Sequence, residues 1–193
     1  HGQRRFVNER DAYQRLLEGS AAAIRDLPDA RLGVAPHSLR AVALDDLGWV
    51  SSLRPNDPVH IHVAEQVPEV EASLKITGKR PVELLMNTIP LDRRWCLIHA
   101  THLSDAERDG IARSGAVAGL CPITESSLGD GIFDGIRYAQ AGGAYGVGSD
   151  SNIQIDAGSE LRQLEYSQRL RDRRRALFAE EKASTGLALW QAA

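Results

Sequence analysis

Five short apolar runs, separated by segments of helical spacing, constrain the fold more than any other feature of this sequence. The runs have the length of β-strands and cover residues 31–35, 59–64, 95–100, 116–121 and 144–148. Apolar residues recur at helical spacing in the segments 45–53, 67–76, 81–87, 105–113, 131–141 and 159–171. This alternation predicts an α/β fold with parallel strands and crossover helices. A further helix is expected over residues 11–27.

Composition and charge favour a small-molecule substrate. The sequence has 193 residues, of which 42% are hydrophobic and 25% are charged, as in globular proteins that bury a sizeable core. A net charge of -3 gives no electrostatic footprint for nucleic acid or an anionic membrane. We therefore expect neither nucleic acid nor a membrane as a partner. The basic cluster 169–175 lacks interleaved aromatic residues and favours a solvated helix end or a subunit contact.

The two cysteines, Cys96 and Cys121, lie far apart and outside any C-x-x-C spacing. Neither a disulfide framework nor a zinc ribbon is therefore expected, and a reducing compartment fits best. No apolar run approaches the roughly 20 residues that span a bilayer, and the first residues lack the apolar stretch of a signal peptide. These observations predict a cytoplasmic protein. Because the sequence opens without an initiator methionine, we expect a fragment of a longer chain.

Polar residues that carry chemistry gather where the apolar runs end. They are His37 after the first run, His62 and Glu65 after the second, His99 and His102 after the third, and Asp150 after the fifth. The carboxyl ends of parallel strands form the face on which α/β folds build their sites. A single histidine of this kind would more often be a packed core residue. Four coincidences of this kind favour a functional site.

The residue types at these strand ends suit a catalytic metal. Imidazole and carboxylate groups bind zinc or iron, and a catalytic site uses about three protein ligands with one position left open. His62 and Asp150 are the candidate metal ligands, and the two-residue period of the strand places His60 on the same face as His62. Glu65 is a candidate general acid or base. Alternatively, Glu65 only begins the next helix, where its charge suits the helix dipole.

Three motifs resemble the amidohydrolase superfamily, and within it the adenosine-deaminase-like enzymes. They are His62-Val63-Ala64-Glu65, His99, and Gly148-Ser149-Asp150-Ser151. Four further stretches, 35–40, 98–103, 120–122 and 128–133, resemble the formiminoglutamate deiminases of this superfamily. The resemblance runs from about residue 2 to about residue 175, and the last eighteen residues carry no signal.

The resemblance implies a (β/α)8 barrel, also called a TIM barrel, of the metal-dependent hydrolases. Strands four to eight of that barrel would be present, so that residues 1–193 form the C-terminal part of one catalytic domain. The family carries a further His-x-His pair of metal ligands on its first strand. His60 and His62 do not fill that role, because only three expected strands follow them. We therefore expect that pair and strands one to three to lie upstream of this sequence.

For activity, the resemblance implies zinc-dependent hydrolytic deimination of N-formimino-L-glutamate to N-formyl-L-glutamate and ammonia, a step of histidine degradation. One divalent metal ion, Zn²⁺ or alternatively Fe²⁺, would be held by the upstream pair, His62 and Asp150. Glu65 would carry a proton to the substrate nitrogen, while His99 and Asp150 orient the attacking hydroxide.

His37 and Arg40 would bind the substrate, because a guanidinium pairs well with a carboxylate. An ordinary surface arginine is the alternative for Arg40. His102 is expected to support loop structure, and Glu125 and Asp130 to order the loop after the fourth run. We also expect a homodimer.

Two other functions remain open from the sequence. The first is a related deaminase or chlorohydrolase that acts on a nucleobase-like heterocycle, which the low aromatic content of 5% disfavours. The second is an inactive remnant that serves as a binding or oligomerisation module. Retention of His62, Glu65, His99 and Asp150 disfavours that second function.

Overall fold

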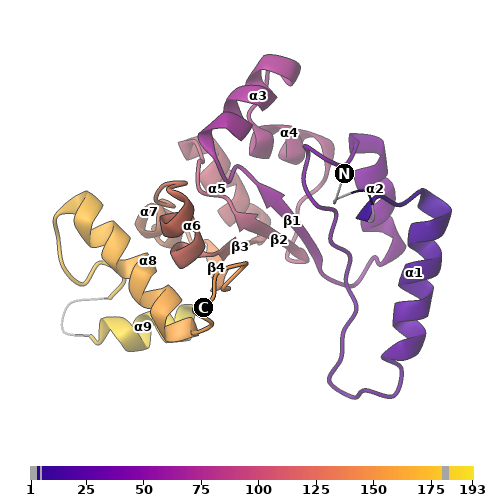
Figure 1. Ribbon diagram of the computed structural model, residues 1–193. Coiled ribbons are helices and arrows are strands. Elements are labelled where there is room, and N and C mark those ends of the chain that lie inside the picture. The colour runs from indigo at the N-terminus through magenta and orange to yellow at the C-terminus, as the bar shows by residue number, and fades with distance from the viewer. Residues whose placement is uncertain (1–3, 5, 180–182) are drawn as a thin grey trace.

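The computed structural model describes residues 4, 6–179 and 183–193, and a four-stranded parallel sheet forms its centre (Figure 1). The strands are β1 (Val59–Val63), β2 (Trp95–His99), β3 (Val117–Leu120) and β4 (Ala144–Val147), and each pairs with the next in chain order. The predicted α/β class with parallel strands is therefore confirmed.

Two helices precede the first strand, and the other described helices follow the strands along the chain. They are α1 (Arg10–Ala23), α2 (Leu44–Leu53), α3 (Val67–Thr77), α4 (Pro81–Thr88), α5 (Asp105–Ser114), α6 (Pro122–Leu128), α7 (Gly135–Gln140), α8 (Ala157–Asp172) and α9 (Thr185–Ala192). In Figure 1, α1 and α2 lie at one end of the sheet, and α8 and α9 lie at the other. Among the described residues, no helix is both long and apolar enough to cross a bilayer.

The helix predicted over 131–141 is confirmed only in part, because glycines interrupt the chain before residue 135. Pro122 occupies the first turn of α6, where its missing N–H costs nothing. Gly129 ends α6 in the left-handed conformation, and Gly131 has a φ of 135°, which no helical residue adopts. Only residues 135–140 of the predicted segment form a helix, α7.

The strand predicted over 31–35 is wrong, so the sheet has four strands among the described residues where five apolar runs predicted five. The segment meets β1 only through two isolated parallel bridges, Val34 with Val59 and Ser38 with His62. The two bridged residues are thus four positions apart in this segment and three positions apart in β1, so the segment bulges. Pro36 lies in this bulge and has no N–H to donate to β1.

The sheet has one face covered by helices and one open face. Val59, Ile61, Trp95, Leu97 and Ala118 alternate along the covered face and are at most 1% exposed. The open face carries the intervening residues, and those at β1, β2 and β3 are at least partly exposed: His60, His62, Cys96, Ile98, Val117 and Gly119. The strand register aligns His62 with Ile98 and then with Gly119 across this face.

Candidate active site

Three histidines form a row across the carboxyl ends of the β1 and β2 region. The ring centroids of His37 and His62 are 5.0 Å apart, and those of His62 and His99 are 5.7 Å apart. The carbonyl oxygen of His37 accepts from both the backbone N–H of His62, at 3.0 Å, and the Nδ1 of its ring, at 2.8 Å. A carbonyl can only accept, so Nδ1 of His62 carries the proton of this contact, and in the neutral ring the lone pair is on Nε2.

Left-handed backbone conformations gather at the same edge of the sheet. Ala64 follows β1, His99 and Ala100 end β2, and Asp150 follows β4, with φ values between 48° and 68°. Such conformations cost energy for residues other than glycine and often occur at functional sites. At His99 this conformation ends the alternation of side chains between the two faces of β2, and the ring lies against that of His62.

Two carboxylates lie on opposite nitrogens of the His99 imidazole. Glu65 places Oε1 at 3.6 Å from Nε2, an ion-pair distance that is too long for a hydrogen bond. Glu125 places Oε1 at 3.3 Å from Nδ1 and also accepts from the backbone N–H of Cys121 at 3.0 Å. His99 is 1% exposed and Glu125 is 3% exposed. The ring is therefore held from both sides inside the protein.

The carboxylates change the pKa of His99. Burial alone would lower the pKa of this imidazole, but the hydrogen bond with Glu125 and the charge of Glu65 outweigh burial and raise it. The charge of Asp150 adds to the same rise. In contrast, burial lowers the pKa of His37, and the neighbouring charges of His62 and Arg40 lower it further. The surroundings thus shift the pKa values of His99 and His37 in opposite directions.

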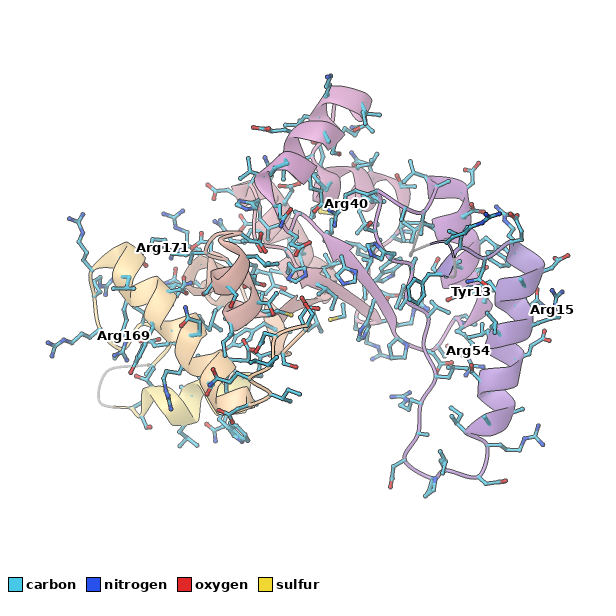
Figure 2. All side chains as sticks on the ribbon, viewed as in Figure 1. Tyr13, Arg15, Arg40, Arg54, Arg169 and Arg171 are labelled. Atoms are coloured by element: carbon cyan, nitrogen blue, oxygen red, sulfur yellow. The ribbon has the colours of Figure 1, made fainter. Side chains whose placement is uncertain are left out.

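Arg40 extends the cluster towards solvent. Its Nη2 lies 3.5 Å from Oε2 of Glu65, and its side chain is 46% exposed. Figure 2 shows Arg40 beside the central sheet, far from Arg169 and Arg171 on α8. An exposed pair at this distance contributes little to stability. The guanidinium is therefore free to exchange Glu65 for another carboxylate at small cost.

Asp150 lies at the same edge of the sheet but apart from this row of contacts. It is exposed, and among the described residues its carboxylate has no hydrogen-bond or ion-pair partner, although its charge reaches His99. The described residues contain no group of three or more histidine, cysteine, aspartate or glutamate side chains arranged to hold a metal ion. His62 and Asp150 are thus both at the edge, but they do not form a complete metal centre by themselves.

Two buried glutamates of the cluster had no predicted catalytic-site role. Glu69 accepts from the backbone N–H groups of Ala64 and Glu65, at 3.1 and 2.9 Å, and so fixes the turn that presents Glu65. Glu125 was expected only to order its loop. Both lie near the start of a helix. Glu69 follows Ala64 by five positions, and Glu125 follows Cys121 by four. A glutamate at this distance after a strand end was the signal in the sequence that could have identified them.

Loops around the cluster are joined through Asp130. Its carbonyl oxygen accepts from Nε2 of His102 at 2.7 Å, and its Oδ1 accepts from Gln66 at 2.8 Å. The backbone N–H of His102 in turn donates to the carbonyl oxygen of Ala64. These contacts agree with the loop-supporting roles predicted for His102 and Asp130.

The cysteines do not add reactive groups to the cluster. Burial raises the pKa of the Cys96 thiol to about 11. Burial, with the charges of Glu125 and Asp150, raises that of Cys121 to about 12. Both thiols are therefore protonated at neutral pH and are poor nucleophiles.

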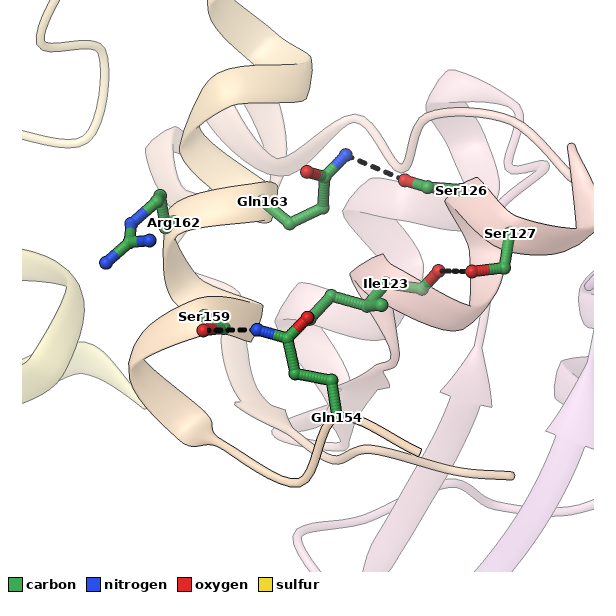
Figure 3. Close-up of a pocket in the computed structure, with 7 residues that line it drawn as sticks. All are labelled: Ile123, Ser126, Ser127, Gln154, Ser159, Arg162 and Gln163. Atoms are coloured by element: carbon green, nitrogen blue, oxygen red, sulfur yellow. Dashed lines mark hydrogen bonds between the residues drawn. The ribbon is translucent and has the colours of Figure 1, made fainter. Parts of the chain in front are cut away.

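A shallow pocket of about 360 Å³ lies elsewhere, between α6 and α8 (Figure 3). Its lining includes Ser126 and Ser127 of α6 and Ser159, Arg162 and Gln163 of α8. Gln163 donates to Ser126 across it at 2.7 Å. Histidine, aspartate and glutamate do not occur in this lining.

The chain is similar in sequence and in structure to known proteins. Formimidoylglutamate deiminase from Pseudomonas aeruginosa is 46% identical over the whole chain, which spans 43% of that protein. The crystal structure of an amidohydrolase from Brucella melitensis superposes with a TM-score of 0.97 at 55% identity and covers 99% of this chain, which spans 43% of that chain.

An adenosine deaminase from Xanthomonas campestris, solved with bound zinc, has the same fold, with a TM-score of 0.82 at 24% identity over 90% of this chain and 40% of that one. The chain therefore spans less than half the length of these relatives. The sequence pattern of the amidohydrolase family matches residues 3–186. The chain belongs to the amidohydrolase family.

Proposed function

We propose that this chain supplies part of the active site of a metal-dependent deiminase that hydrolyses N-formimino-L-glutamate to N-formyl-L-glutamate and ammonia. The observation that carries this proposal is the placement of Glu65 between His99 and Arg40. A group suited to proton transfer thus lies beside a group suited to bind a carboxylate. Formiminoglutamate carries a basic amidine nitrogen and two carboxylates. The similarity to formimidoylglutamate deiminase supports the same substrate.

We also propose that the sheet is part of a (β/α)8 barrel. Parallel strands in sequential order, with helices packed on one face, are the arrangement of such barrels. The bridged segment 34–38 would correspond to strand four, and β1 to β4 to strands five to eight. The open face, with His60 and His62, would then face the barrel interior.

A divalent metal ion, zinc or iron, fits part of this donor set. The proton on Nδ1 of His62, donated to the carbonyl of His37, leaves Nε2 available in the way usual for metal-binding histidines. The carboxylate of Asp150 has no hydrogen-bond or ion-pair partner among the described residues. Two ligands are fewer than a catalytic metal needs, so other parts of the full protein would supply the rest. A cation bound there would acidify a water molecule and stabilise developing negative charge.

The side chains of this chain would carry out the remaining work. Arg40 would bind a substrate carboxylate in place of Glu65 and so set the position of the formimino carbon. Glu65, released from Arg40, would carry a proton from the attacking water to the leaving nitrogen. His99, held beside Glu65, would orient the attacking oxygen. His37 would line the substrate site next to Arg40.

Ammonia release by the protein, produced from its whole gene, would test this function. We expect formiminoglutamate to be consumed with formation of formylglutamate, in a reaction that a chelator abolishes and zinc restores. S-adenosylhomocysteine and 8-oxoguanine serve as competing substrates. Faster release of ammonia from either of these than from formiminoglutamate would contradict the proposal and favour a heterocycle deaminase.

A further inference from the structure

Glu125 is the buried group that most closely constrains His99 and has no assigned role in the chemistry proposed above. It lies in the first turn of α6, and the strand that it follows, β3, is adjacent to the strand that ends in His99. Its Oε1 accepts from the backbone of Cys121 at 3.0 Å and lies 3.3 Å from Nδ1 of His99. One oxygen thus joins the carboxyl ends of β2 and β3.

In the contact between Glu125 and His99, the imidazole must be the donor. A carboxylate only accepts, so the contact holds a proton on Nδ1 of His99. In the neutral ring, the lone pair is then on Nε2, the nitrogen that faces Glu65 at 3.6 Å. The left-handed backbone of His99 gives no such preference for one nitrogen. The tautomer and the orientation of this ring therefore depend on Glu125.

We propose that Glu125 is a positioning residue, which fixes the tautomer and orientation of His99 so that Nε2 faces the reacting groups. The inference rests on the proposed function for the role of His99. The tautomer of His99 itself can be measured without any substrate.

Other buried glutamates show what a purely structural role looks like. Glu107 is 3% exposed, as is Glu125, and it accepts from the backbone N–H groups of Ser104 and Glu83 and from Arg80. It has no histidine partner among the described residues. Substitution of Glu107 therefore provides a matched control for the loss of a buried, hydrogen-bonded glutamate.

The decisive measurement is the ¹⁵N spectrum of histidine-labelled protein at alkaline pH, where the rings are neutral. His99→Asn identifies the His99 signals. In the parent protein we expect His99 as the Nδ1–H tautomer and His102, which donates from Nε2 to Asp130, as the opposite one. In Glu125→Met, which has no acceptor for either N–H, His99 should become a mixture of tautomers. Glu125→Gln keeps an amide oxygen that can accept from both Cys121 and His99, and it should keep the Nδ1–H tautomer. His102 should not change in either variant, and neither ring should change in Glu107→Met.

Kinetics of the protein produced from its whole gene complete the test. Loss of such a partner typically costs on the order of 10–100-fold, so kcat should fall by about that factor in Glu125→Met, with little change in KM. Glu125→Asp, which keeps the charge, should recover part of the rate.

The inference is overturned if the tautomer of His99 is the same in Glu125→Met and Glu125→Ala as in the parent, or if Glu107→Met shifts it equally. Should Glu125→Ala fail to fold, the spectrum of Glu125→Met alone decides. A shifted tautomer in a protein that does not act on formiminoglutamate would keep the positioning role and reject only the proposed substrate.

Discussion

Glu65 lies within ion-pair distance of two groups of different chemistry, the imidazole of His99 and the guanidinium of Arg40. If it transfers protons and does not bind the metal, Glu65→Gln in the complete protein should keep its metal but lose most activity. General acid–base groups typically contribute on the order of 10²–10⁴-fold, and we expect kcat to fall within that range. Metal analysis and ammonia release measure the two effects separately.

Glu71, an exposed residue of the following helix, provides the control for this substitution. Glu71→Gln should change neither the metal content nor the rate. If Glu65→Gln loses its metal together with activity, Glu65 is a ligand or a structural support, and the proton-transfer role is wrong.

The proposed substrate rests on Arg40. If it binds a substrate carboxylate, Arg40→Met should raise the KM for formiminoglutamate more than it lowers kcat, because the contact is the same in ground and transition states. A charge-assisted pair contributes roughly 2–5 kcal/mol when its partner is left unpaired, so kcat/KM should fall at least about thirtyfold. Arg40→Lys should recover only part, since an ammonium lacks the planar fork of a guanidinium.

An analogue of formiminoglutamate with amidated carboxylates separates binding from structure. The parent enzyme should process it poorly, and Arg40→Met should process it about as well as the parent does. An equal loss on both compounds would make Arg40 a structural residue and would remove the main argument for a substrate derived from glutamate.

Some of the site residues could be predicted from the sequence and others could not. His62, Glu65 and His99 could be predicted because each lies at or just after the end of an apolar run, where a strand ends. Glu125 could not be assigned to His99, because 26 residues separate them and only the pairing of β2 with β3 brings them together. Asp150 was placed at the correct edge, but its lack of a close partner depends on the path of an irregular loop.

At the scale of elements, the loop between α6 and α7 depends on one glycine. A Cβ built on Gly131 would lie 3.1 Å from Cε1 of His102, and the φ of 135° is unfavourable for any residue with a side chain. Gly131→Ala should lower the free energy of unfolding by about 1–3 kcal/mol. Urea denaturation monitored by circular dichroism measures this change.

Gly19, in the middle of α1, is the matched control. A Cβ there meets nothing within 4 Å, and alanine is the better helix former, so Gly19→Ala should stabilise by up to about 1 kcal/mol. Equal effects of the two substitutions would contradict the role assigned to Gly131.

The elements that were predicted wrongly share a physical cause. Apolar content identified the run 31–35, but hydrogen bonding decides whether a run becomes a strand, and the bulge at Pro36 limits the pairing to two bridges. Likewise, helical spacing over 131–141 did not reveal that Gly129 and Gly131 adopt positive φ. The strands β1, β2 and β3 were predictable because their buried residues alternate within uninterrupted runs.

At the scale of the whole molecule, the described residues do not assemble a complete metal centre. The 193-residue chain by itself should therefore bind zinc weakly, release little or no ammonia from formiminoglutamate, and gain both properties when joined to the remaining part of the full protein. Calorimetric titration with zinc and an ammonia assay check this expectation. Tight, stoichiometric zinc binding by the chain alone would show that it contains further ligands.

Buried glutamates that hold backbone N–H groups have a consequence for hydrogen exchange. Glu69 protects the amides of Ala64 and Glu65, and Glu125 protects that of Cys121, although none of these amides donates within the sheet. Their protons can exchange with solvent only when the carboxylate moves away. The exchange rates of these three amides therefore report how often the turns at the carboxyl ends of β1 and β3 open, independently of how often the strands themselves separate.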